Sequence, residues 1–284
     1  MNQNLPGSKD VRAAFDRVAE RYHQHAALEQ EVSSRLLERL AFQKLVPQRI
    51  IDLGSGTGHC TRALKRQFPR AEVIGLDASL SMCQELHRKS GFFRPVRPVC
   101  ADLAQLPFAG RCADLLFSNL AMQWCGDFHA LTAGFRRVLR TNGLLLFSTL
   151  GPGSLREFRL TGDPLVRPFV DMHDIGDALL AAGFSEPVVD SQSITTEYQD
   201  FERLWMDLEW TGASTHFADW QQWTAASPLA TGFEALRRPG GLPVSWEIIF
   251  GAAFGPPEGQ PIKTMEGDIA AFSVDSLRGS RRPK

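Results

Sequence analysis

The chain has 284 residues, of which 43% are hydrophobic, and this is enough apolar material to bury a substantial core. Its 31 Lys and Arg residues against 32 Asp and Glu residues give a formal net charge of −1, so the charge balance favours neither a nucleic-acid nor an anionic-membrane partner. The five cysteines are odd in number and form no CxxC pair, which predicts reduced thiols in a cytoplasmic protein rather than a disulfide framework or a metal site.

The first 45 residues predict helices. Apolar residues recur three and four positions apart from Val11 to Tyr22 and again from Val32 to Leu40, so each segment presents one apolar stripe. Over 46–152, short apolar runs alternate with helical patterns, which indicates a doubly wound α/β core with a mostly parallel sheet. The expected strands lie at 49–54, 72–77, 95–102, 113–119 and 144–150, and the expected helices at 57–68, 79–90 and 131–139, the last ended by Asn142 and Gly143.

The regular alternation weakens after Gly151. Residues 153–242 are expected to complete the core and to add a helical cap, with a helix at 174–184, a strand at 187–190 and a region that holds Trp205, Trp210, Trp220 and Trp223. Residues 243–256 predict the final strand, and 257–284 a surface tail. No stretch approaches the roughly 20 apolar residues that a bilayer requires, so we expect no membrane association.

The strongest local signal is the turn after the first strand, IIDLGSGTGHC, in which Gly54, Gly56 and Gly58 alternate. A dinucleotide fingerprint requires Gly or Ala three residues after Gly56, and His59 stands there instead. The remaining pattern, D-x-G-x-G-x-G from Asp52, resembles motif I of the class I S-adenosylmethionine-dependent methyltransferases. This resemblance implies a Rossmann-like, seven-stranded sheet and S-adenosylmethionine as the cofactor.

Acidic residues follow the first three strands, at the edge of the sheet where such folds bind ligands. Asp52 can accept a hydrogen bond from the ammonium group of the cofactor, directly or through water, and Asp77 can hold both ribose hydroxyls. A lone Asp after a strand is more often a helix cap or a turn former, but three in succession beside the glycine turn favour a cofactor site.

The family resemblance extends the cofactor site further along the chain. Asp102 resembles the acid near the adenine amine, with Leu103 as an apolar neighbour, and Asn119 marks where the methyl group should point. The full predicted set is Asp52, Gly54, Ser55, Gly56, Thr57, Gly58, Asp77, Ala78, Met82, Asp102, Leu103 and Asn119.

Four segments resemble a narrower family: AAFDRVAERYHQHA (13–26), SNLAMQWCGD (118–127), FSTLGPGSLREF (147–158) and LPVSWEIIFGAA (242–253). They look like the malonyl-acyl-carrier-protein O-methyltransferases, which mask a malonyl carboxylate at the start of biotin synthesis. The resemblance implies methyl transfer to the free carboxylate of a malonyl thioester, carried on acyl carrier protein or on coenzyme A. The segment WTGASTHFADW (210–220) departs from these relatives, since only Gly212 and Ala213 match.

A malonyl carboxylate is already ionised at neutral pH, so the implied reaction needs no general base. Tyr22 is a candidate to close over the sulfonium, or else to staple its helix onto the core. Gln123 is a candidate to border the acceptor, as is Trp124, which could equally fill the core. Arg156 is the preferred carboxylate clamp. Two other arginines stay open as clamps, Arg137 and Arg140.

Carrier proteins are acidic, so a basic patch should lie near the pocket. Candidates for it are Arg136, Arg137, Arg140, Arg237 and Arg238. His23 and His25 lack a third ligand in the sequence, so we expect no metal. Two other functions remain open: a methyltransferase for another small acid, and a methyltransferase-like assembly factor that transfers no methyl group.

Overall fold

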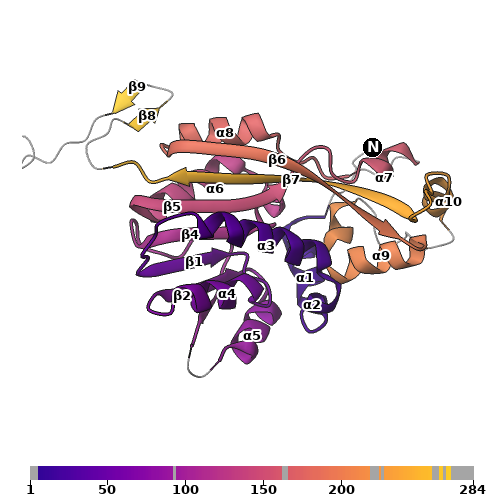
Figure 1. Ribbon diagram of the computed structural model, residues 1–284, viewed down its shortest axis with the longest axis horizontal. Helices are drawn as coiled ribbons and strands as arrows, with labels where there is room; N and C mark the ends of the chain where they lie inside the picture. Colours follow the sequence, from indigo (N-terminus) through magenta and orange to yellow (C-terminus); the bar gives the residue numbers. More distant parts are fainter. Residues whose placement is uncertain are drawn as a thin grey trace, which may run out of the picture.

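A seven-stranded sheet in the order β3-β2-β1-β4-β5-β7-β6 forms the centre of the computed structural model (Figure 1). The model describes residues 6–91, 94–161, 166–217, 224 and 227–257, and the backbone of 262–264 and 267–269. The strands of the sheet are β1 (Arg49–Leu53), β2 (Glu72–Asp77), β3 (Arg97–Cys100), β4 (Ala113–Asn119), β5 (Leu139–Leu150), β6 (Ser185–Tyr198) and β7 (Leu242–Phe254). β7 runs antiparallel to both its neighbours, whereas β1 to β5 pair in parallel, so the predicted fold class is confirmed.

Helices cover both faces of this sheet and one of its ends (Figure 1). They are α1 (Ser8–Val18), α2 (Tyr22–His25), α3 (Ala27–Ala41), α4 (His59–Gln67), α5 (Leu80–Lys89), η1 (Met122–Trp124), α6 (Phe128–Val138), α7 (Arg156–Leu160), α8 (Met172–Ala181), α9 (Phe201–Trp210), η2 (Ala213–His216) and α10 (Pro228–Glu234). The predicted cap corresponds to α9, η2 and α10, which the chain inserts between β6 and β7.

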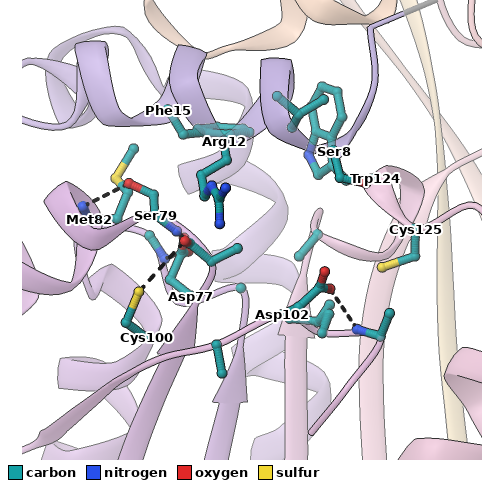
Figure 2. Close-up of a pocket in the computed structure, with 18 of the residues that line it drawn as sticks. Ser8, Arg12, Phe15, Asp77, Ser79, Met82, Cys100, Asp102, Trp124 and Cys125 are labelled. Atoms are coloured by element: carbon teal, nitrogen blue, oxygen red, sulfur yellow. Dashed lines mark hydrogen bonds between the residues drawn. The ribbon is translucent and has the colours of Figure 1, made fainter.

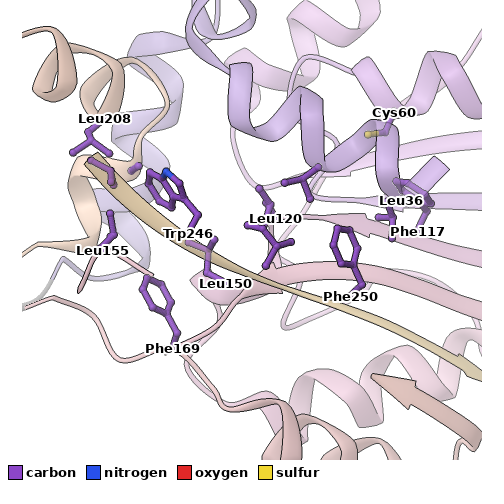
Figure 3. Packing of buried hydrophobic residues seen from close by; sticks show 14 of the residues in the cluster. Leu36, Cys60, Phe117, Leu120, Leu150, Leu155, Phe169, Leu208, Trp246 and Phe250 are labelled. Carbon is purple, nitrogen blue, oxygen red and sulfur yellow. The ribbon is translucent and has the colours of Figure 1, made fainter. Parts of the chain in front are cut away.

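Consecutive residues of the central strands pack into opposite layers, as the pleat of a strand requires. In β4, Leu115 and Phe117 join the core under α3 and α4, and Leu116 joins the core under α6 and α8. Figure 3 shows the first of these layers, where Leu36 of α3, Phe117 and Phe250 of β7 share one cluster. Burial on both faces explains why the strands read as continuous apolar runs.

The helices α1 and α2 and the cap lie together at one end of the sheet (Figure 1). The apolar stripe predicted to be continuous from Val11 to Tyr22 is broken, because α1 ends at Val18 and Tyr22 begins the short α2. Asp16 fastens α1 to the start of α5, since its Oδ1 accepts hydrogen bonds from Ser79 Oγ (2.6 Å) and Ser81 N (3.0 Å).

The expected helix end at Asn142 and Gly143 is wrong. α6 ends at Val138 and β5 begins at the next residue, so Asn142 lies within the strand. There its φ is +57°, a left-handed conformation that Asn tolerates, and the pairing of β5 with β4 is irregular over this stretch. Asn142 N donates to Gly255 O (2.8 Å), and Gly255 N donates to Gly143 O (2.9 Å), which anchors the irregular segment.

Trp220, Trp223 and most of the predicted tail lie outside the described residues. Within the tail, β8 (Ile262–Thr264) and β9 (Gly267–Ile269) form an antiparallel pair. Among the residues that the structure describes, none of the helices has the length and apolar character needed to cross a membrane. The cytoplasmic location stays a prediction.

Candidate active site

A cavity of about 420 Å³ lies between α1 and the carboxyl ends of β1 to β4 (Figure 2). Figure 2 shows Ser8, Arg12 and Phe15 on the α1 side, and Asp77 and Asp102 on the side of the strands. Eight of the twelve residues predicted to bind the cofactor line this cavity: Gly54, Gly56, Asp77, Ala78, Met82, Asp102, Leu103 and Asn119. The structure thus brings the ends of four strands together at one ligand-sized cavity.

The glycine loop needs its glycines for two separate reasons. Gly54 has a φ of +73°, and a Cβ there would lie 2.2 Å from the Cβ of Ala121. Gly58 has a φ of +81°, and a Cβ there would lie 2.0 Å from Cδ1 of Leu86. Both positions therefore combine a left-handed backbone with a close approach, which only glycine accepts without strain.

The Asp77 carboxylate is oriented by two backbone groups. Its Oδ2 accepts from Gly56 N (2.8 Å) and its Oδ1 from Ser79 N (2.9 Å). Burial raises its pKa to about 6, against the effect of these hydrogen bonds and with a further contribution from Asp16. Each oxygen keeps a lone pair, so this carboxylate can accept hydrogen bonds from two adjacent hydroxyl groups.

Asp52 is placed differently from Asp77. Its carboxyl group is buried, with 1% of the residue exposed, and Oδ2 accepts from Thr61 Oγ1 (2.6 Å), so it joins the end of β1 to α4. Burial raises its pKa to about 7, partly offset by Thr61. Asp52 and Gly58 line neither this cavity nor the smaller one beside it, whereas Ser55 and Thr57 line the smaller one.

Tyr22 and Asn119 form the inner wall, where the large and small cavities meet. Asn119 is fixed at both ends of its amide, because Nδ2 donates to Glu29 O (3.0 Å) and Oδ1 accepts from Ser148 Oγ (2.9 Å). Burial, followed by Glu29 and Asp77, raises the pKa of Tyr22 well above its usual value. The phenol therefore stays protonated at neutral pH and can donate a hydrogen bond but cannot act as a base.

An aromatic stack connects the cap to a residue of the cavity wall. Trp124, which lines the cavity, lies flat on the His216 ring at 3.9 Å between ring centroids and 5° between planes. Phe169 meets the same imidazole edge-on at 5.0 Å. Burial, then Arg167, lowers the pKa of His216 well below its usual value, so the ring is neutral where it supports Trp124. No local sequence pattern distinguishes His216, and it was not predicted.

Two predicted catalytic residues do not line the cavity. Gln123 uses both ends of its amide internally, with Nε2 donating to Leu120 O (2.7 Å) and Oε1 accepting from Thr149 Oγ1 (3.3 Å). Arg156 lies on α7 with 61% of its side chain exposed and pairs with Glu157 at 3.3 Å. The structure therefore brings Tyr22 to the cofactor residues and leaves Gln123 and Arg156 outside that group.

The other predicted arginines are engaged within the fold. Arg137 donates to the carbonyl oxygens of Leu106 and Phe108, and Arg140 pairs with Asp114 at 2.7 Å. Arg136 donates to Gly183 O and Arg237 pairs with Glu234, whereas Arg238 is exposed and bonds to Gly241 through its backbone.

Among the described residues, the Lys and Arg side chains that line the cavity are Lys9 and Arg12 of α1. Both are exposed and lie three positions apart, on one face of the helix. That spacing can be read from the sequence. The two residues were not predicted to line the site, because they precede the first segment that carries the family resemblance. The pair His23 and His25 forms no common site, since His25 bonds to Asp207 (2.9 Å) and His23 stacks on His59.

Comparisons with known proteins agree with this geometry. Residues 51–147 match the family model described as a methyltransferase domain. The chain is 41% identical over 271 residues to a malonyl-[acyl-carrier protein] O-methyltransferase of Gallionella capsiferriformans, covering 90% of this chain and 93% of that protein. It is 37% identical to the protein of the same name from Halorhodospira halophila, with 96% of each chain covered.

Solved structures share the fold at low identity. The YcgJ protein of Bacillus subtilis superposes with a TM-score of 0.57 at 18% identity, covering 80% of this chain and 99% of its own. A phosphoethanolamine N-methyltransferase 2 of Haemonchus contortus, in complex with S-adenosylhomocysteine, superposes with a TM-score of 0.55 at 18% identity, covering 87% of this chain and 60% of its own.

Proposed function

The chain belongs to the malonyl-[acyl-carrier protein] O-methyltransferase family, and from that premise we propose that it methylates the free carboxylate of a malonyl group carried on acyl carrier protein. The methyl donor is S-adenosylmethionine, and the products are a malonyl methyl ester and S-adenosylhomocysteine. The reaction opens the pimeloyl branch of biotin synthesis. These relatives favour neither an assembly factor that transfers no methyl group nor a methyltransferase for another small acid.

The residues present fit this cofactor. The cavity of about 420 Å³ has a carboxylate, Asp77, that can accept two adjacent hydroxyl groups at one wall, and Asp102 beside Leu103 at another. Ser55 Oγ is shielded from solvent without a hydrogen-bond partner among the described residues, as expected of a group that a ligand completes. When bound, S-adenosylmethionine supplies an electrophilic methyl group on a positively charged sulfur.

The position of Tyr22 where the two cavities meet is the observation that carries the proposed chemistry. A nitrogen, carbon or hydroxyl acceptor usually needs a group that removes its proton, whereas a carboxylate is ionised at neutral pH. The Tyr22 phenol is protonated at neutral pH, and burial raises its pKa further. Its hydroxyl can therefore donate to an oxygen of an anionic acceptor and so orient it.

The wall around Tyr22 supports catalysis by orientation. Phe15 stands 6.2 Å from Tyr22 and 5.5 Å from Trp124, measured between ring centroids, and Trp124 rests on His216. A rigid aromatic wall excludes water and fixes the approach of the acceptor, and good alignment alone is worth about 7–11 kcal/mol of the barrier. Lys9 and Arg12, which line the cavity, supply positive charge for an acidic carrier and its carboxylate.

Methyl transfer to malonyl-acyl carrier protein tests the proposal directly. The purified protein is incubated with methyl-labelled S-adenosylmethionine and with malonyl-acyl carrier protein, malonyl-coenzyme A or free malonate. The matched control is acetyl-acyl carrier protein, which presents the same carrier and thioester without a free carboxylate. We expect a base-labile methyl ester on the malonyl thioesters and none on the acetyl control. Equal labelling of the acetyl control, or none on any malonyl substrate, contradicts the proposal.

A further inference from the structure

A second cavity, of about 50 Å³, adjoins the cofactor cavity on the side of α2 and α3. The two cavities share Tyr22, Gly56 and Asn119. Ser55 of the glycine loop and Glu29 of α3 both line the small cavity. A ligand that runs along the glycine loop can therefore extend one small group into it.

Two polar atoms of this small cavity lack partners. Glu29 Oε2 and Ser55 Oγ are each shielded from solvent and accept or donate no hydrogen bond within the described part of the chain. Buried polar atoms of folded proteins are nearly always paired, so two such atoms on residues that line the same cavity indicate a ligand with polar groups.

No ion pair compensates the carboxyl group in the small cavity. In the described structure no Lys, Arg or His lies within ion-pair distance of Glu29, and its pKa is raised to about 7, mainly by burial, with its own backbone N–H opposing the rise and Asp207 adding to it. The titratable groups that face Glu29 or share its cavity are Tyr22, His23, His59, Cys60, Tyr198 and Asp207. Asp207 is itself bonded to His25, and burial lowers the pKa values of His23 and His59, so none of these groups neutralises Glu29.

The chemistry of the donor identifies the missing partner, given the proposed function. S-adenosylmethionine bears a sulfonium, which has no hydrogen to donate, a carboxylate, which only accepts, and an α-ammonium group with three donors. A buried, unpaired carboxylate oxygen is best satisfied by a positively charged donor, which also compensates its charge. We infer that Glu29 binds the α-ammonium group of the cofactor in the small cavity, with Ser55 Oγ left to donate to the adjacent carboxylate.

The placement of Asp52 strengthens this inference. Sequence patterns favoured Asp52 for the ammonium group, but its carboxyl group bonds to Thr61 and lines neither cavity. Glu29 presents its carboxyl group at the cavity wall instead, and its main-chain oxygen accepts from Asn119, which ties α3 to the end of β4. Glu29 is thus a cofactor-binding residue contributed by a helix outside the glycine motif.

Paired ligands test the contact without depending on activity. S-adenosylhomocysteine keeps the amino-acid end of the cofactor, and 5′-methylthioadenosine lacks it. By isothermal titration calorimetry, we expect Glu29→Gln to lower the affinity for S-adenosylhomocysteine about 10- to 100-fold, the range of a lost hydrogen bond to a charged group. The affinity for 5′-methylthioadenosine should stay within twofold of the wild-type value. The matched control is Glu31→Gln on the same helix, since Glu31 is exposed and pairs with Arg35. It should change neither affinity.

Proton exchange gives a second readout. Calorimetric titrations at pH 7 in buffers of different ionisation enthalpy measure the number of protons released on binding. The wild-type protein should release more protons than Glu29→Gln when S-adenosylhomocysteine binds, because an ammonium partner favours the ionised form of Glu29. Equal proton release by the two proteins overturns the inference.

The affinities separate failure of this inference from failure of the proposed function. Unchanged S-adenosylhomocysteine affinity in Glu29→Gln overturns the inference and leaves the proposed function standing. An equal loss of affinity for both ligands does the same, because it would mean that Glu29 only shapes the cavity. Binding of 5′-methylthioadenosine by the variant also shows that the site is folded. If wild type binds neither ligand, the proposed function falls and this inference falls with it.

Discussion

Replacing Asp52 by Asn should stabilise the protein without its cofactor, and more so at pH 8 than at pH 5. The pKa of Asp52 is raised from 3.8 to about 7 in the folded state, so ionising this buried carboxyl group opposes folding. The folded state is most favoured below pH 3.8, and that advantage is lost as the pH rises to 7. At about 1.36 kcal/mol per pKa unit, the loss reaches about 2 kcal/mol at pH 5 and about 4 kcal/mol at pH 8.

Asn is neutral at both pH values, and its side-chain oxygen can still accept from Thr61 Oγ1. The stabilisation by Asp52→Asn should therefore be larger at pH 8 than at pH 5 by about 2–3 kcal/mol, or roughly 4 °C in melting temperature. Differential scanning fluorimetry of the cofactor-free protein measures this difference. A melting-temperature shift that is the same at both pH values would refute the reasoning.

A control of opposite sign is available at Asp114. Burial alone would raise its pKa, but the N–H groups of Arg49 and Gln48 and the guanidinium of Arg140 hold it below the usual value. Its stabilising effect is present above the unfolded pKa and is lost as the pH falls through the folded one. Asp114→Asn should accordingly lower the melting temperature at pH 8.

Four further substitutions test the site. Tyr22→Phe should lower kcat at least tenfold while changing the Kd for S-adenosylhomocysteine less than threefold, because the ring remains and the donor to the acceptor is lost; steady-state kinetics and calorimetry decide this. Gly54→Ala should abolish cofactor binding and cost at least about 2 kcal/mol of stability in urea unfolding, given its left-handed φ and the 2.2 Å approach. Arg12→Ala should raise the KM for malonyl-acyl carrier protein more than Arg156→Ala does, because Arg12 lines the cavity; a larger effect at Arg156 would restore the clamp that the sequence favoured.

The sheet and the cofactor edge were predictable because their signals are local. A buried strand reads as a short apolar run, and its end is marked by the next polar residue, so β4 was placed at its observed limits, Ala113–Asn119. Asp77 followed from the same logic, since the carboxyl ends of parallel strands share one edge. β6 was recognised only at 187–190, because the rest of this edge strand, through Tyr198, alternates with mostly polar residues.

The residues that complete the site were not predictable, because tertiary packing places them. Glu29 meets Asn119 across 90 positions of sequence, and the pattern of α3 gives no sign that one of its acidic side chains faces a cavity. His216 reaches Trp124 only because the cap folds back over the sheet. Arg156 shows the converse: its segment resembles the family, yet its side chain lies on the surface beside Glu157.

The hydrogen bonds of Asp16 hold α1 in place, and this affects the order in which substrates bind and products leave. α1 roofs the cofactor cavity and is held by Asp16 to the start of α5, next to the loop that orients Asp77. We expect the donor to bind beneath this helix and the carrier-bound acid to approach from outside it. This arrangement favours a compulsory-order kinetic scheme in which the donor binds first and the spent donor leaves last.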